Sequence, residues 1–465
     1  MNRLSAATLC VLLLSTGCGA VRYPRPAVTV PATYRGEEPS GAHYESLGEL
    51  RWEDLIRDEE LAQFIREALA NNYDAQIAAA RVLEARAQFG MSRSALFPSV
   101  DAEAGYNNLR SSENSAAPIA GGFSTEIDYT SVSAGLAWEI DLWGRIRNAN
   151  AAARAALLAS EEGRKAVLQT LVSEVAAGYF LLLDLDQEVE ITSRALRLRE
   201  DSLELIQLRV GHGYSCELDL RQAEVLVKSA RTALSQLELE REQAENRLAV
   251  LLGRNPGPIE RGRSLLEEEF VLSLPTGLPS TLLDRRPDIR QAEQQLIGDQ
   301  ALVAVAKAAF FPRLSLTASS GYESSDLLQL FSPANSTWAF GPLTNLPIFS
   351  AGRVRAGVRS AEARRIQSLL LYRKTVQQAF REVADSLASR RRLAELRAEQ
   401  AELVESLKQA VELADLRYRG GVSSYLEYLD SERQLLDAQL RLVQLRRDEL
   451  TNTITLYRAI GGGWQ

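Results

Sequence analysis

Apolar residues recur at helical spacing through the C-terminal part of the chain. From Val358 to Arg419 there is no Gly and no Pro, and Ala, Leu, Val and Ile are interspersed with Arg, Glu and Gln as in a long amphipathic helix. Counted from Gly352, such a helix would be roughly 100 Å long at about 1.5 Å per residue. This length far exceeds what a globular domain requires, so the pattern predicts an extended helical architecture.

A sharp reversal interrupts this pattern at Gly420 and Gly421, and a second helical pattern follows. The two glycines can supply the left-handed backbone that ends a helix. Either Ser423 or Ser424 can then cap the next helix. Residues 352–460 are therefore predicted to form a helical hairpin.

The same hairpin occurs earlier in the chain. Residues 208–220 match residues 416–428 at a constant offset, so that Leu218 falls on Leu426 and Asp219 falls on Glu427. Self-similarity at this scale indicates an internal duplication. The chain is therefore not a set of unrelated domains joined by linkers.

Next to the helical hairpins, the period changes from helical to alternating. Val132, Ala134 and Leu136 alternate with small or polar residues, and residues 314–319 show the same alternation. Such alternation predicts strands with one apolar face and one polar or small face. In a soluble β-sandwich the apolar face would point to a core, but here the flanking helices are too long to fold back over it.

A shared barrel is the other explanation for these strands. One chain offers only four of them, which cannot close a barrel, and an open edge cannot lie in lipid. Three chains would supply twelve strands, with the apolar face outward and the polar face lining a lumen. The export signal described next favours this explanation over the sandwich.

The N-terminus resembles a bacterial lipoprotein signal. Arg3 precedes a short apolar core at residues 4–14, and Ser15-Thr16-Gly17-Cys18 resembles a cleavage box. Cys18 would then be the first mature residue and would carry acyl chains that anchor it in a membrane leaflet. The alternative is an ordinary cleaved signal peptide that leaves Cys18 as a thiol.

Composition excludes several classes of function. A net charge of −8 argues against a nucleic-acid binder, which would show a basic face. His43 and His212 lack the spacing of a metal site or a nucleophile relay, and no Gly-rich loop suited to phosphate follows a strand. We therefore expect no enzyme activity, no cofactor and no metal site.

These patterns predict the segments of the chain. A helix from Trp52 to Gly90 opens the first repeat, and Pro287 would begin a helix in the second. The segments are a signal peptide at 1–17, a tether at 18–50, a first repeat at 51–253 (strands 97–143, helical hairpin 145–252), an equatorial connection at 254–285, and a second repeat at 286–465 (strands 311–349, the last from Ser336 to Phe349, then helical hairpin 352–460).

Three stretches carry a resemblance to a known family: Trp138 to Arg145, Leu282 to Arg290, and Tyr418 to Gly421 with its continuation to Asp430. The chain resembles the TolC-family outer-membrane efflux proteins, in the lipoprotein branch that serves resistance-nodulation-division pumps. The resemblance implies a mainly α fold with a small β part, in which a homotrimer forms a twelve-stranded β-barrel on a twelve-helix periplasmic tunnel.

The implied function is a passive outer-membrane channel for drugs and other small toxic molecules. It would receive them from a periplasmic adaptor protein and an inner-membrane pump, and it would open at its periplasmic helical tips. The implied location is the bacterial outer membrane, in contact with its lipid. Two alternatives remain open, namely an exit duct for type I secretion and a periplasmic coiled-coil adaptor.

The resemblance also assigns residues to the tips. Tyr418, Leu426 and Asp430 match positions that ring the constriction in relatives, and Asp219 matches a hydrogen-bonding partner. Arg433, one turn after Asp430, and Tyr418, across the tip, are the candidate partners of Asp430 by sequence. The alternative is that these residues only pack one helix on the next. The expected gate residues are Tyr418, Leu426, Glu427, Asp430, Arg433 and Asp219, and the expected adaptor-facing residues are Val210, Gly211, Gly213, Gly420, Gly421 and Val422.

Overall fold

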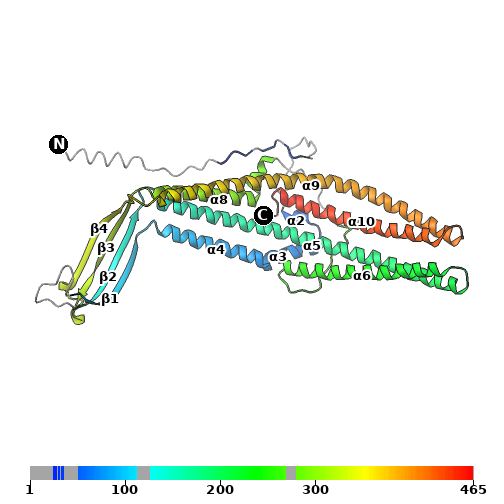
Figure 1. Ribbon diagram of the computed structural model, residues 1–465, viewed down its shortest axis with the longest axis horizontal. Helices are drawn as coiled ribbons and strands as arrows, with labels where there is room; N and C mark the ends of the chain where they lie inside the picture. Colours follow the sequence, from blue (N-terminus) through cyan, green and yellow to red (C-terminus); the bar gives the residue numbers. More distant parts are fainter. Residues whose placement is uncertain are drawn as a thin grey trace. The chain divides into compact units, whose positions relative to one another are not determined.

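The computed structural model describes residues 25–28, 30–31, 33–35, 51–112, 126–268 and 279–463. Its described part is mainly helical with one small sheet, which confirms the predicted fold class (Figure 1). The predicted signal peptide, Cys18 and most of the tether lie outside the described residues.

Two helical hairpins dominate the described chain. The first consists of α5 (Arg145–Gly211) and α6 (Glu217–Leu251), and the second of α9 (Arg353–Arg419) and α10 (Tyr425–Ala459). Both outgoing helices have 67 residues and both return helices have 35. Each bound of the second hairpin follows its counterpart by the same number of residues, as the internal duplication predicts.

Between residues 51 and 94 the chain forms three helices where the sequence predicts one. These are α2 (Trp52–Leu55), α3 (Glu59–Asn71) and α4 (Tyr73–Ser94). The breaks have a local cause, because polar side chains cap the new helices. Asp58 accepts a hydrogen bond from the Glu60 N–H at 2.8 Å, and Asn72 accepts one from the Asp74 N–H at 2.8 Å. The prediction of a continuous helix from Trp52 to Gly90 is therefore wrong.

Helix α7 (Leu282–Arg285) precedes the predicted second repeat, and α8 (Pro287–Ala308) is the first helix within it. Pro287 opens α8, as predicted, because a missing N–H costs nothing in the first helical turn. Short 3₁₀ turns complete the helical elements: η2 (Pro279–Thr281), η3 (Leu327–Gln329) and η4 (Pro333–Asn335).

The four strands form one antiparallel sheet in the order β1-β2-β3-β4. They are β1 (Ser99–Arg110), β2 (Glu126–Ile140), β3 (Arg313–Ser324) and β4 (Ser336–Asn345). Strand β4 ends before the expected Phe349, since Pro347 has no N–H to donate to a neighbouring strand. Pro342 is compatible with β4 because this strand lies at a sheet edge.

The register of the sheet separates its two faces. One row across all four strands is apolar and consists of Val100, Leu136, Ala318 and Phe340. The adjacent row is small and polar and consists of Ser99, Ala137, Thr317 and Gly341. The apolar side chains have no core to cover them among the described residues, because Val100 is 69% exposed and Phe340 is 67% exposed. The alternating pattern thus gives the faces that the sequence predicts.

The described chain divides into two compact units, and each draws on both repeats. One includes residues 82–160 and 292–372 and holds the sheet. The other includes residues 161–291 and 373–465 and holds the ends of both helical hairpins. The division into repeats at 51–253 and 286–465 describes the duplication in the sequence and stays a prediction.

Within the helical unit, Arg286 ties three segments together. Its side chain is only 9% exposed. Its guanidinium donates to Asp288 at 2.7 Å, to Glu382 of α9 at 2.8 Å and to the Ala459 carbonyl at the end of α10 at 3.0 Å. The planar fork of arginine suits such simultaneous contacts.

A second buried polar cluster fastens the segment that follows α6. The Tyr179 hydroxyl of α5 donates to Asp58 at 2.9 Å, and the Gly262 N–H donates to the Tyr179 oxygen at 2.9 Å. Glu268 also lies against Asp58 and is 2% exposed. Burial and, after it, the hydrogen bond with Asp58 raise the pKa of Glu268 to about 8.

Candidate functional site at the hairpin tips

The two hairpins end in the same backbone turn. Gly213 and Gly421 have φ of 75° and 73°, the left-handed conformation that favours glycine. The Val422 N–H donates to the Arg417 carbonyl at 2.9 Å, and the Tyr214 N–H donates to the Arg209 carbonyl at 2.8 Å. These bonds form the Schellman motif, which satisfies carbonyls at a helix end.

Two details of the predicted turn are wrong. Gly420 does not have a positive φ, because a single left-handed residue at Gly421 completes the motif. Ser424 occupies the N-cap position of α10, but its side chain makes no capping hydrogen bond. The Ser423 hydroxyl is buried and has no hydrogen-bond partner among the described residues.

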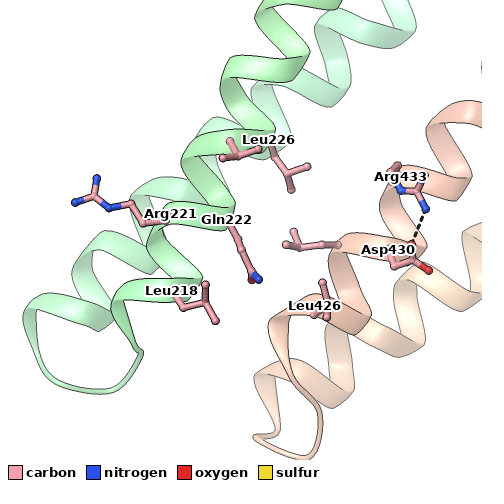
Figure 2. Close-up of a pocket in the computed structure, with 9 residues that line it drawn as sticks. Leu218, Arg221, Gln222, Leu226, Leu426, Asp430 and Arg433 are labelled. Carbon is pink, nitrogen blue, oxygen red and sulfur yellow. Dashed lines mark hydrogen bonds and ion pairs between the residues drawn. The ribbon is translucent and has the colours of Figure 1, made fainter.

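A groove of about 430 Å³ lies between the two tips (Figure 2). In Figure 2, Gln222 points from α6 toward the second tip, whereas Arg221 points away from it. Leu426 and Leu218 are exposed by 59% and 64%, so apolar surface is open to solvent here. The lining residues are Leu218, Arg221, Gln222, Val225, Leu226, Leu426, Leu429, Asp430 and Arg433.

Asp430 pairs within its own helix. Its carboxylate accepts from Arg433 at 2.8 Å and from Gln434 at 2.6 Å, and both hydrogen bonds are exposed. The hydrogen bond from Arg433, followed by the one from Gln434, lowers the pKa of Asp430. Asp430 therefore stays ionised at neutral pH, with the partner that helical spacing suggested.

Tyr418 is not the second partner of Asp430. Its ring lies 5.1 Å from the ring of Tyr425, and the Arg209 guanidinium lies 5.1 Å from its centroid. Its hydroxyl is buried without a hydrogen-bond partner in the described part of the chain. Tyr418 thus packs α9 against its neighbours, which is the packing alternative considered from the sequence.

The remaining expected gate residues also bind locally. Asp219 accepts from the Ser215 hydroxyl at 2.7 Å and from the Cys216 N–H at 3.4 Å. The hydrogen bond from Ser215 lowers the pKa of Asp219. Through these bonds Asp219 stabilises the turn of its own hairpin. Glu427 accepts from Arg417 at 3.1 Å.

The residues expected to face an adaptor differ in exposure. Val422 is 71% exposed, whereas Val210 packs against the buried cluster between the tips. That cluster consists of Ile206, Ala223, Tyr425 and Leu429.

This site also contains a buried ion pair that was not predicted from the sequence, formed by Arg199 of α5 and Glu432 of α10. The sequence contains one indication of this ion pair. Tyr425, Leu429 and Glu432 are spaced as neighbours on one helical face, so a carboxylate interrupts an apolar stripe. The described residues contain no group of three or more His, Cys, Asp or Glu side chains that could hold a metal ion.

Known proteins similar to this chain agree with this architecture. The solvent efflux pump outer membrane protein SrpC of Pseudomonas putida is 37% identical over 462 residues, which cover 97% of each chain. The cation efflux system protein CusC of Escherichia coli K12 is 35% identical over 460 residues, which cover 98% of each chain.

Solved structures of outer-membrane proteins are also similar to this chain. The open state of the Neisseria gonorrhoeae MtrE outer membrane channel matches with a TM-score of 0.84 and 32% identity, covering 96% of this chain and 98% of that one. A membrane protein from Pseudomonas aeruginosa matches with a TM-score of 0.86 and 33% identity, covering 95% and 99%. The family profile for outer membrane efflux proteins matches residues 64–254 and 278–462. The chain belongs to the outer membrane efflux protein family.

Proposed function

We propose that three copies of this chain form the outer-membrane channel of a tripartite efflux system, through which small molecules pass passively to the exterior. The sheet is the observation that carries this proposal. One face of it is largely apolar with exposed Val100 and Phe340, and the other face is largely small and polar. This two-faced pattern suits a wall between lipid and a water-filled lumen.

Closure of this wall requires further strands. Strands β1 and β4 are the edges of the sheet, and unpaired backbone groups at an edge cannot be left in hydrocarbon. If β4 of one copy pairs with β1 of the next, three copies close a barrel and no edge remains. The relatives named above are efflux pump components, and their names refer to solvents in one case and to cations in the other.

The hairpin tips would form the periplasmic gate of this channel and the contact with an adaptor protein, which in turn joins an inner-membrane pump. Exposed apolar side chains at the tips, such as Leu218, Leu426 and Val422, support a contact with another protein. Asp430 and Arg433 would lie near the axis of the trimer. Acyl chains on Cys18 would add a lipid anchor to the barrel.

The gate prediction tests this function. Removing the carboxylate with Asp430→Ala leaves Arg433 without its neutralising partner, and three such arginines near one axis repel one another. We expect trimers of this variant in planar lipid bilayers to spend more time in a conducting state than wild type. Cells that carry the variant should admit more vancomycin.

The control changes a similar ion pair away from the tips. Glu405 and Lys408 form an exposed pair with the same spacing on α9, and Glu405→Ala should leave conductance at the wild-type level. Trimers that conduct neither as wild type nor as Asp430→Ala would refute the channel. The lipid anchor has a separate test, in which cells are grown with labelled palmitate. The label should appear on the wild-type protein and be absent from Cys18→Ala.

A further inference from the structure

Several polar contacts join α5 of the first hairpin to α10 of the second in the described part of the chain. Arg447 donates to Asp184 at 2.6 Å, and Gln444 donates to Glu188 at 2.8 Å. Nearer the tips, Arg199 pairs with Glu432, and Ser202 and Tyr428 share a hydrogen bond one turn farther on. The nearest nitrogen–oxygen distance between Arg199 and Glu432 is 3.9 Å. The contacts with Asp184 and Glu188 are therefore short, whereas the Arg199–Glu432 ion pair is long.

The Arg199–Glu432 ion pair is buried on both sides. The side chain of Arg199 is 6% exposed and that of Glu432 is 11% exposed. Nε of Arg199 has no hydrogen-bond acceptor among the described residues. Burial raises the pKa of Glu432, and the positive charge of Arg199 only partly opposes this. A buried pair with poor geometry does not recover the cost of removing its charges from water.

The position of the pair connects it to the gate. Tyr425 and Leu429 lie on the same face of α10 as Glu432 and contact Ile206 and Ala223 of the first hairpin. Asp430 occupies the neighbouring face and lines the groove between the tips (Figure 2). A shift of α10 along α5 therefore changes the Arg199–Glu432 distance and the position of Asp430 together.

We propose that Arg199 and Glu432 are positioning residues for the gate, which hold the second tip in register with the first within one protomer. This inference rests on the proposed channel function. The distance of 3.9 Å exceeds the usual length of about 2.8 Å for a hydrogen bond between such charged groups. A displacement of α10 by about 1 Å would be enough to bring the pair to that length. The distance between the two charges therefore responds to the position of α10 along α5.

Charge removal at Glu432 tests the proposal. Glu432→Gln leaves the positive charge of Arg199 buried without a counter-ion, which disfavours the register of the two tips. We expect the fraction of time that trimers conduct in planar bilayers to rise about tenfold. The heat resistance of the trimer, followed on gels, should change little, because a merely structural role would lower it without changing conductance.

Three matched variants serve as controls for this test. Glu200, the neighbour of Arg199, forms an exposed pair with Arg231 within the first hairpin, and Glu200→Gln should conduct like wild type. Arg199→Lys keeps the charge and should conduct less than Arg199→Gln. The double variant Arg199→Gln with Glu432→Gln buries no unpaired charge and should conduct less than either single variant.

The outcomes that would contradict the positioning role differ from those that would contradict the channel function. Assembled Glu432→Gln trimers with wild-type conductance, or effects of the two single variants that simply add, overturn the positioning role. If Glu432→Gln does not assemble, Glu432→Asp keeps the charge but shortens the side chain, and unchanged conductance in that variant overturns the role equally. A wild-type channel that responds to Asp430→Ala but not to these changes leaves the proposed function intact. Trimers that conduct neither as wild type nor as Asp430→Ala refute the channel itself.

Discussion

Trimers of the Leu136→Arg variant should assemble poorly. Leu136 lies in the apolar row between Val100 and Ala318, on the face that would meet lipid. A charged side chain there costs up to about 2–4 kcal/mol near the bilayer midplane. Because the proposed assembly contains three copies, each trimer would bear this cost three times. The measurement is the yield of heat-resistant trimer after refolding into lipid vesicles.

The neighbouring residue provides the control. Ala137 lies in the adjacent row between Ser99 and Thr317, on the small and polar face. Ala137→Arg would place its charge in the water-filled lumen and should reduce the yield much less. A lower yield for Ala137→Arg than for Leu136→Arg would mean that the faces are assigned the wrong way round.

The Arg286→Ala variant should lose about 1–3 kcal/mol of unfolding free energy. Without the guanidinium, Glu382 and Asp288 lose a shared cation, and the Ala459 carbonyl loses its donor. The Ala459 carbonyl is then a buried acceptor without a donor, which is more costly than a broken surface pair. Urea unfolding of detergent-solubilised protein, followed by circular dichroism, measures the difference.

Arg194 offers a surface comparison. It pairs with Glu190 on α5, and both side chains are more than half exposed. Arg194→Ala should therefore change stability by at most about 1 kcal/mol. Equal losses of unfolding free energy in Arg286→Ala and Arg194→Ala would show that the contacts of the buried arginine do not stabilise the fold.

The architecture was predictable because it depends on periodic patterns. Helical spacing of apolar residues, uninterrupted by Pro, predicts the long helices, and the duplication predicts that the second hairpin repeats the first. Alternation of apolar and small residues sets the faces of the sheet, since the side-chain period of a strand is two. These signals are repeated over many residues, so no single position decides them.

The polar partners at the tips were less predictable. Arg433 was expected beside Asp430 because one helical turn separates them. The partner of Tyr418 and the pairing of Arg199 with Glu432 depend instead on how distant helices pack and which side-chain rotamers fit. Family resemblance suggests which positions matter, but it does not give the contacts that they make.

The buried cluster around Asp58 couples folding to proton uptake. Glu268 has a pKa of about 8 in the folded chain, against an ordinary value of 4.5. Between these two values the folded chain holds a proton that the unfolded chain releases, so unfolding is favoured as the pH rises. Stability should therefore decline from weakly acidic conditions up to about pH 8 and then level off, an effect that Glu268→Gln should remove in urea titrations. Alkaline surroundings would thus loosen the attachment of the segment after α6 before they affect the apolar core.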